Sequence, residues 1–76
     1  MIYVRLFAHL PAASSSGTAE FQVEAREGLT VRDVVVDAGI TPETVYIVLV
    51  NNVRVDLDAP LADGDRLALF PPVSGG

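Results

Sequence analysis

The sequence contains no cysteine and no lysine among its 76 residues. Without cysteine, the chain can form neither a disulfide nor a thiolate metal site, and it has no thiol nucleophile. Without lysine, it has no side-chain amine that could be acylated or joined through an isopeptide bond. Basic residues are few, since five arginines face ten carboxylates and the net charge is −5. Nucleic acids and anionic membranes are therefore poor partners, and an acidic domain is expected to be attracted to a basic protein surface instead.

Long apolar runs are also missing. The longest, at residues 45–50, is far too short to span a bilayer, and Arg5 interrupts the apolar opening, which does not fit a secretory signal. We therefore expect a cytoplasmic protein. Half of the residues are hydrophobic, which excludes a disordered chain, but a single domain of this size has little room for an enclosed active site. A binding or carrier role is favoured over a self-sufficient enzyme.

The residue pattern predicts a small α+β domain. Alternating apolar residues indicate strands, and apolar residues at helical spacing indicate one helix, which Thr30 and Asp33 can cap. Asn51-Asn52 is typical of a tight hairpin. The expected elements are strands at 2–8 and 21–25, a helix at 30–38, a short turn at 41–43, and strands at 45–50, 53–55 and 66–70. This order gives a sheet of about five strands with the helix on one face and the other face free.

The free sheet face is the first candidate site. When the strands bury alternate apolar residues, Phe7, Leu49, Ala68 and Phe70 are expected to lie together on the opposite face. An exposed apolar patch of this kind usually marks an interface with another protein. The sequence leaves open that a loop or a chain end covers these residues, or that one strand has a different register.

No resident metal or cofactor is indicated. The carboxylates of the 56–65 loop do not follow the spacing of a calcium loop, because Pro60 and Leu61 occupy positions that need a ligand and a glycine. We expect these carboxylates to form turns. His9 is the only histidine, the serines at 14–16 have no base motif beside them, and no glycine-rich phosphate motif occurs.

The segment 71–76 is the second candidate site. Its two prolines restrict the direction in which it leaves the domain, which we take as residues 1–70. Because Gly75 and Gly76 lack a Cβ, they can enter a channel too narrow for any other residue. We interpret the segment as an extended tail that inserts into another protein's active site, with the Gly76 carboxylate as the reactive group. The alternative is a frayed terminus or an expression remnant.

Several segments resemble the MoaD/ThiS family of ubiquitin-like sulfur carriers. They are Val4-Arg-Leu-Phe-Ala, Val50-Asn-Asn, Asp63-Gly-Asp, and the ending Phe70-Pro-Pro-Val-Ser-Gly-Gly. The ending is close to that of the small subunit of molybdopterin synthase. The resemblance covers nearly the whole chain in the order of its elements, while the specific motif lies in residues 63–76.

The resemblance implies a β-grasp (ubiquitin-like) fold and a carrier cycle. A partner resembling ubiquitin-activating enzymes would use ATP to adenylate the Gly76 carboxylate, and a persulfide sulfur would displace AMP to leave a thiocarboxylate. In molybdopterin synthase, such a tail enters the large subunit and gives its sulfur to the dithiolene of the cofactor precursor. The chain would supply the reactant, and its partners would supply the catalytic groups. The residues expected to contact partners are Phe7, Leu49, Ala68, Phe70, Pro71, Pro72, Val73 and Ser74, followed by Gly75 and Gly76.

Other functions remain open at this level. The same activated carboxylate could acylate a lysine, as in a ubiquitin-like modifier, or the free sheet face could serve a simple interaction domain. Sulfur carriage for another pathway, such as thiamine synthesis, is a further alternative, although the thiamine carriers usually lack the Phe-Pro-Pro run.

Overall fold

The structure is a computed structural model that describes residues 1–8, 10 and 17–72. Its elements are strand β1 (Ile2–Leu6), strand β2 (Glu20–Val23), helix α2 (Val31–Asp37), the 3₁₀ helix η1 (Pro42–Thr44), and strands β3 (Ile47–Val50), β4 (Val53–Val55) and β5 (Arg66–Phe70). The predicted order of strands and helix is confirmed, and the short turn expected near Pro42 is η1.

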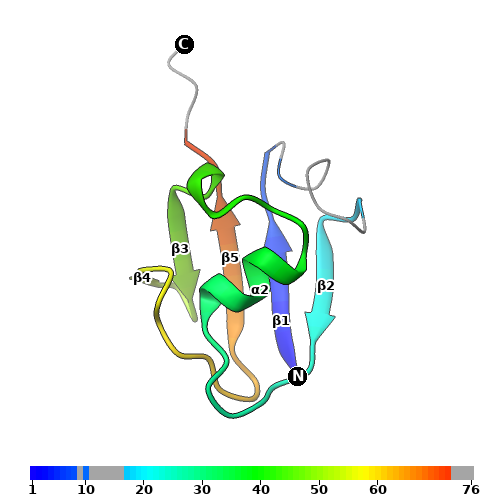
Figure 1. The fold of residues 1–76 in the computed structure, drawn as a ribbon, viewed down its shortest axis with the longest axis vertical. Helices are drawn as coiled ribbons and strands as arrows, with labels where there is room; N and C mark the ends of the chain where they lie inside the picture. Colours follow the sequence, from blue (N-terminus) through cyan, green and yellow to red (C-terminus); the bar gives the residue numbers. More distant parts are fainter. Residues whose placement is uncertain (9, 11–16, 73–76) are drawn as a thin grey trace.

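The five strands form one mixed sheet in the order β2-β1-β5-β3-β4. The central pair, β1 and β5, is parallel, and every other pair is antiparallel. Helix α2 crosses one face of this sheet (Figure 1). The α+β roll with one main helix is therefore confirmed, and the strand order brings the first and the last strand together in the middle.

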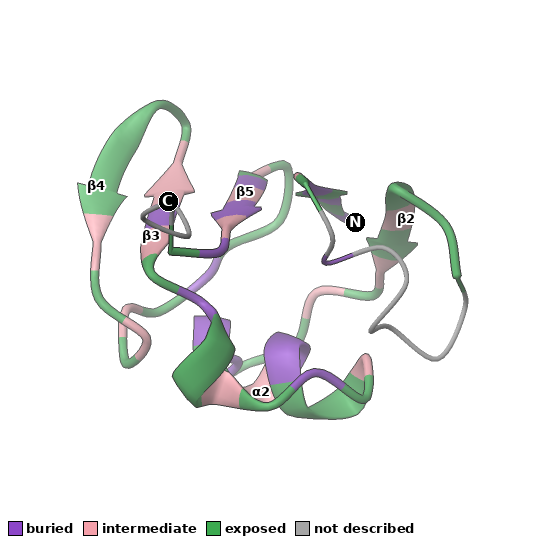
Figure 2. Cartoon of the chain, turned by 90° about the horizontal axis from the view of Figure 1, so that it is seen from above, coloured by how far each residue is buried: buried purple, intermediate pink, exposed green. Residues whose placement is uncertain are grey.

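The core lies between the sheet and α2, as the two layers in Figure 2 show. Strict alternation places Ile2, Val4 and Leu6 in the core from β1, while Tyr3 and Arg5 stay exposed. Other strands and the helix contribute the fully buried side chains Leu67, Leu69, Val31, Val34 and Val35. The described residues include no helix that is long and apolar enough to cross a membrane.

Helix α2 is fixed by the predicted caps. The Asp33 amide donates to the Thr30 hydroxyl at 3.3 Å, and the Thr30 amide donates to the Asp33 carboxylate at 3.0 Å, which completes the capping box. The hydrogen bond from the Thr30 backbone N–H, with a further contribution from the Thr30 side chain, holds the pKa of Asp33 below its ordinary value. Helix α2 ends at Asp37 with Ala38 as its C-cap, and Gly39 follows with a φ of +81°, as expected of a glycine just after a helix.

Three strands are shorter than predicted. Strand β1 ends at Leu6 rather than at residue 8 because Ala8 has a φ of +55°, which is incompatible with a strand. Strand β3 starts at Ile47 rather than at residue 45, because Val45 closes η1 by donating its amide to the carbonyl of Pro42. The turn at Asn51-Asn52 is confirmed, since both residues have positive φ, as a type I′ hairpin requires. Strand β2 spans 20–23 instead of 21–25, which matches the reach of its β1 partner.

Candidate functional site

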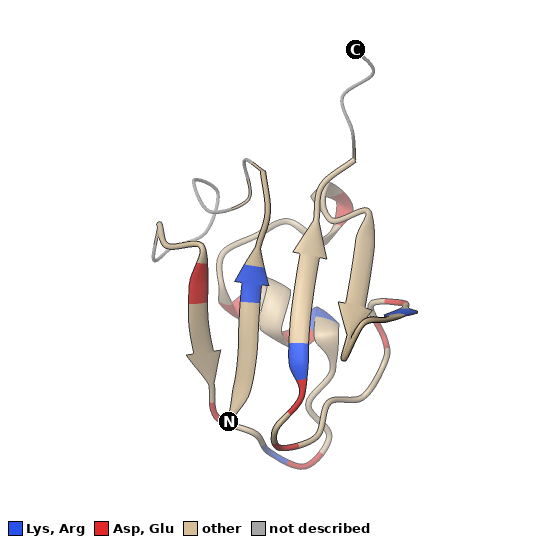
Figure 3. Ribbon diagram, turned by 180° about the vertical axis from the view of Figure 1, so that it is seen from behind, with Lys and Arg blue, Asp and Glu red and all other residues tan. Residues whose placement is uncertain are grey.

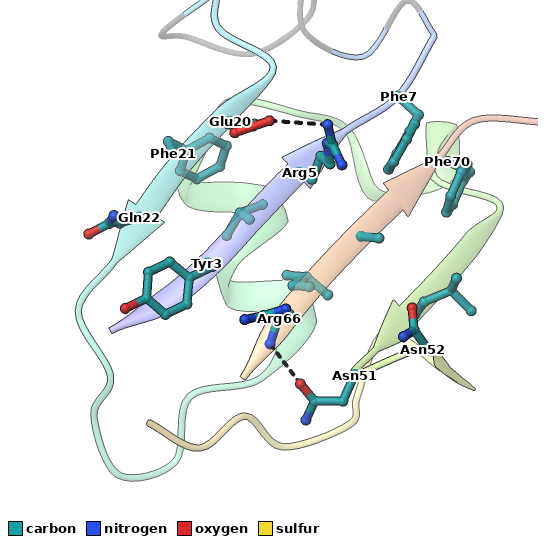
Figure 4. A pocket seen from close by; sticks show the side chains of 14 residues that line it. Tyr3, Arg5, Phe7, Glu20, Phe21, Gln22, Asn51, Asn52, Arg66 and Phe70 are labelled. Carbon is teal, nitrogen blue, oxygen red and sulfur yellow. Dashed lines mark hydrogen bonds and ion pairs between the residues drawn. The ribbon is translucent and has the colours of Figure 1, made fainter. Parts of the chain in front are cut away.

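The sheet face that points away from α2, called the outer face below, carries an open hollow of about 500 Å³. Its lining comes mainly from β1, β5 and β2, and Leu49 of β3, Phe7 and the β3–β4 turn contribute the rest (Figure 4). Side chains alternate along each strand, so the residues between the core positions of these strands reach this face. The outer face is therefore a direct consequence of the same alternation that forms the core.

All four residues predicted for the apolar patch line this hollow, namely Phe7, Leu49, Ala68 and Phe70. Leu49 lies opposite Ala68 in the antiparallel β3–β5 pair, so the two side chains share the outer face as expected. The rings of Phe7 and Phe70 stack with their centroids 4.2 Å apart and their planes 10° apart. Each of the four side chains remains partly exposed, so the structure brings them together at the surface. That a partner contacts them stays a prediction.

Polar residues beside this patch, among them Tyr3, Arg5 and Arg66, were not included in the predicted site. The guanidinium group of Arg5 lies 5.6 Å from the centre of the Phe7 ring and pairs with Glu20 at 3.3 Å. Tyr3, beside Arg66 in the β1–β5 register, is 47% exposed on the same face. The alternation that places Phe7 outward also places Tyr3 and Arg5 outward, so the sequence contained the signal for them. The arginine–aromatic contact and the ring stack depend on strand pairing, which the sequence does not state.

Near the start of β5, the hollow is lined by Asn51, which lies in a network of hydrogen bonds. Its amide group donates to Asp65 at 2.9 Å, and its oxygen accepts from the backbone N–H of Arg66 at 3.0 Å. The second oxygen of Asp65 accepts from the amide of Ala62 at 2.8 Å. These bonds fix the hairpin turn against the start of β5, and hence the position of Arg66.

Among the carboxylates of the 56–65 loop, Asp56 and Asp65 accept turn hydrogen bonds as predicted, whereas Asp58 pairs with Arg32 of α2 and Asp63 with the N-terminus. Asp56 accepts from the amide of Asp58 at 3.0 Å, and Asp63 contacts the α-ammonium group of Met1. The hydrogen bond and the charge of that ammonium group hold the pKa of Asp63 below its ordinary value. Within residues 1–8, 10 and 17–72, no three His, Cys, Asp or Glu side chains are grouped as a metal site would need.

The predicted tail lies mostly outside the described residues. Pro71 is buried, so packing continues one residue past Phe70, and Pro72 is exposed. Val73, Ser74, Gly75 and Gly76 lie outside the described part, as do His9 and the serines at 14–16. The roles predicted for the tail residues therefore stay predictions. Because Phe70 is the last residue of β5, the aromatic stack stands at the point where the chain leaves the sheet.

Similar proteins are found by sequence and by structure. The molybdopterin synthase sulfur carrier subunit of Escherichia coli (strain K12) is 59% identical over 27 residues, which cover 36% of this chain and 33% of that protein. The match thus spans a third of the length of the curated relative.

Solved structures match over nearly their whole length. SAMP1 of Haloferax volcanii, the small archaeal modifier protein 1, is 31% identical with a TM-score of 0.73, and the match covers 99% of this chain and 98% of SAMP1. A putative molybdopterin converting factor subunit 1 from Pyrococcus furiosus is 29% identical with a TM-score of 0.71, over 95% and 97% of the two chains. In a complex of subunits 1 and 2 of the molybdopterin-converting factor from Helicobacter pylori, the matched chain is 24% identical with a TM-score of 0.61, over 99% and 97%, which shows a shared fold.

The expected ubiquitin-like β-grasp fold is confirmed by these structural matches together with the strand order. The model of the ThiS family matches residues 4–76, from β1 through the paired glycines that follow the sheet. The outer face and the segment after β5 both lie within this match. Over almost its entire length, therefore, this chain belongs to the ThiS family.

Proposed function

We propose that the chain is a sulfur carrier of the MoaD/ThiS type, with the Gly76 carboxylate as the group that carries sulfur. The observation that carries the proposal is the family match, which spans residues 4–76 and so includes Gly76. The 59% identity to a sulfur carrier subunit over 27 residues supports the same reading. A free carboxylate at residue 76 is a requirement of this proposal, and the experiment below tests it.

The chemistry proceeds by activation and substitution. The Gly76 carboxylate attacks the α-phosphate of ATP, releasing pyrophosphate and forming an acyl-adenylate, which is a far better electrophile than a carboxylate. The terminal sulfur of a persulfide then attacks the carbonyl carbon, and AMP leaves. A second thiol reduces the resulting acyl disulfide, becoming oxidised to a disulfide and releasing the thiocarboxylate. The adenylating partner binds the ATP, and this chain holds no cofactor of its own.

Two partners follow from this cycle: an adenylating enzyme that resembles ubiquitin-activating enzymes, and an acceptor of the sulfur. We propose that both dock on Phe7, Leu49, Ala68 and Phe70, because this patch lies where the chain leaves β5. We place the cycle in the cytoplasm, which supplies the ATP. For the acceptor we propose a subunit of the molybdopterin synthase type, a choice supported by the names of the relatives, one of which is described in complex with a second subunit. The dithiolene of a pterin cofactor precursor would then receive the sulfur.

A ubiquitin-like modifier is the second candidate, favoured by the likeness to a small archaeal modifier protein. Both functions need the same acyl-adenylate, so they differ only in the nucleophile that accepts the acyl group. A lysine amine gives an isopeptide bond, whereas a persulfide gives the thiocarboxylate. A carrier for thiamine synthesis shares the thiocarboxylate and differs in the acceptor alone.

The experiment is the intact mass of the chain after incubation with ATP, an adenylating enzyme and a sulfur donor. We expect the mass gain for one oxygen replaced by sulfur. A chain that lacks Gly76, and one extended beyond it, are the matched controls and should show no gain. Transfer of the unmodified acyl group to lysines of other proteins would favour the modifier. Sulfur loading of the extended chain would refute the proposal.

A further inference from the structure

Charge is segregated in this fold. The five strands carry three arginines and a single glutamate, whereas the helix and the loops carry two arginines and nine carboxylates. Figure 3, which looks onto the outer face, shows basic residues in both central strands, β1 and β5, with acidic residues mainly around the periphery. The net negative charge expected to attract basic surfaces thus belongs to the helix side and the loops, while the candidate site itself has the opposite sign.

Arg66 is the arginine on this face that has no carboxylate partner among the described residues. Arg5 pairs with Glu20, Arg26 with Asp37, and Arg32 with Asp58, at N–O distances between 3.1 and 3.8 Å. Arg54, on the edge strand β4, lies over the ring of Tyr46 at 5.9 Å. The Arg66 side chain is exposed, lines the hollow and stands beside Tyr3 (Figure 4).

The backbone of Arg66 is held by hydrogen bonds at both its N–H and its carbonyl, although its side chain has no ionic partner in the part of the chain that the structure describes. The backbone N–H of Arg66 donates to the side-chain oxygen of Asn51. The backbone carbonyl of Arg66 accepts from the backbone N–H of Asn51 at 2.8 Å. In the sheet, Arg66 lies beside Tyr3 of β1. On the other side of β5, the next residue, Leu67, is paired with Val50 of β3. A guanidinium group carried by a backbone that is already fixed is preorganised to pair with one carboxylate, since little backbone entropy is lost on binding.

We propose that the outer face binds a segment of a partner protein that presents one carboxylate to Arg66 and apolar side chains to the Phe7–Phe70 stack. The identity of that partner rests on the proposed function; the chemistry of the contact rests on the surface itself. Arg66, Ala68 and Phe70 alternate along β5, so they are about 7 Å apart in succession and the outer two are about 13 Å apart. The carboxylate therefore binds about 13 Å from the aromatic stack, at the end of β5 opposite the exit of the chain.

A single carboxylate fits this surface better than a polyanion does. Glu20 already neutralises Arg5, and it would repel a second negative group at that end of the hollow. Ala68 and Leu49 lie between Arg66 and the aromatic stack, and they offer only apolar contact. Along β5, the surface thus offers first an ionic contact, then an apolar contact and then an aromatic one. This order matches a protein segment in which one carboxylate is followed by apolar side chains.

The decisive probe is the pentapeptide Asp-Ser-Leu-Ser-Phe with both ends blocked, titrated into the isotope-labelled full chain and followed by amide chemical shifts. We expect shifts at Arg66, Ala68 and Phe70, at least fivefold weaker binding of the peptide with Asn for Asp, and the same loss for R66E and R66Q. R26E changes the charge equally on the other side of the molecule and should bind as the unaltered chain does. Dispersed amide spectra of each variant verify that it folds.

Equal affinity for the Asp and Asn peptides, or shifts confined to the helix side, would overturn the proposal. Self-association of the unaltered chain that R66E abolishes would overturn it too, because the occupant would then be the acidic side of a second copy. A chain lacking Gly76 should bind the peptide normally, so failure of the sulfur chemistry and failure of this surface are distinguishable. With the adenylating enzyme, R66E should raise at least tenfold the chain concentration needed for half-maximal sulfur loading, and R26E should not.

Discussion

Replacing Leu67 by alanine should destabilise the fold far more than replacing Leu49 by alanine. The two residues lie on adjacent, paired strands, but Leu67 is 1% exposed in the core and Leu49 is partly exposed on the outer face. Truncating a fully buried leucine removes its transfer free energy and leaves a cavity, at a cost of about 2–5 kcal/mol. Truncating Leu49 leaves a gap that water can enter, so we expect a loss of about 1 kcal/mol.

This difference is large relative to the stability of the domain. A chain of 76 residues is expected to have a free energy of unfolding of roughly 4–11 kcal/mol, so Leu67→Ala can remove about half of it. Urea unfolding followed by circular dichroism measures both variants, with equal m-values as the sign that the same surface is exposed. Sulfur loading should rank the two variants in the opposite order. Leu49→Ala should impair loading directly, whereas Leu67→Ala should impair it only where the fold is lost. Equal destabilisation by the two variants would refute the assignment of the inner and outer faces.

Three further predictions concern the cap, the pH dependence and the tail. Thr30→Ala should cost about 1 kcal/mol in urea unfolding and speed hydrogen exchange in the first turn of α2, with Thr41→Ala, whose side chain makes no cap bond, as control. Asp33 and Asp63 have folded pKa values below the ordinary 3.8, so the stability they add is complete above that value and is lost as pH falls through the lower folded pKa. The urea midpoint should therefore drop in strong acid, and less so in the D33N/D63N double variant; identical pH profiles would contradict this. Gly75→Val should leave the urea midpoint unchanged yet abolish sulfur loading, whereas loss of folding would mean that the segment packs on the domain.

The sequence was sufficient for the elements whose signals are local. The capping box at Thr30 and Asp33, the glycine after α2 and the asparagine pair of the hairpin all depend on neighbours within four residues. The strand ends were less predictable. Ala8 is excluded from β1 by its positive φ, and Val45 is excluded from β3 because it caps the preceding 3₁₀ helix. Those boundaries depend on backbone conformations that apolar alternation does not encode.

The candidate site was predictable in part. Alternation placed Phe7, Leu49, Ala68 and Phe70 outward, but the stack of Phe7 on Phe70 and the place of Arg66 beside Tyr3 follow from the parallel β1–β5 pair. These strands are about sixty residues apart in the chain. The five arginines are far apart in the sequence, so the segregation of charge appears only when distant strands share a face.

The central position of β5 also has a consequence for biosynthesis. Strand β5 is the common neighbour of β1 and β3, so before it is made the growing chain has only two separate strand pairs, β2–β1 and β3–β4. Isolated two-stranded ribbons are marginally stable in water, and long-range pairing must wait for the strand that joins them. Folding on the ribosome therefore completes only after residue 70 has emerged. A prematurely terminated chain would lack both the complete sheet and its outer face, and such an unfolded chain would be exposed to proteolysis in the cell.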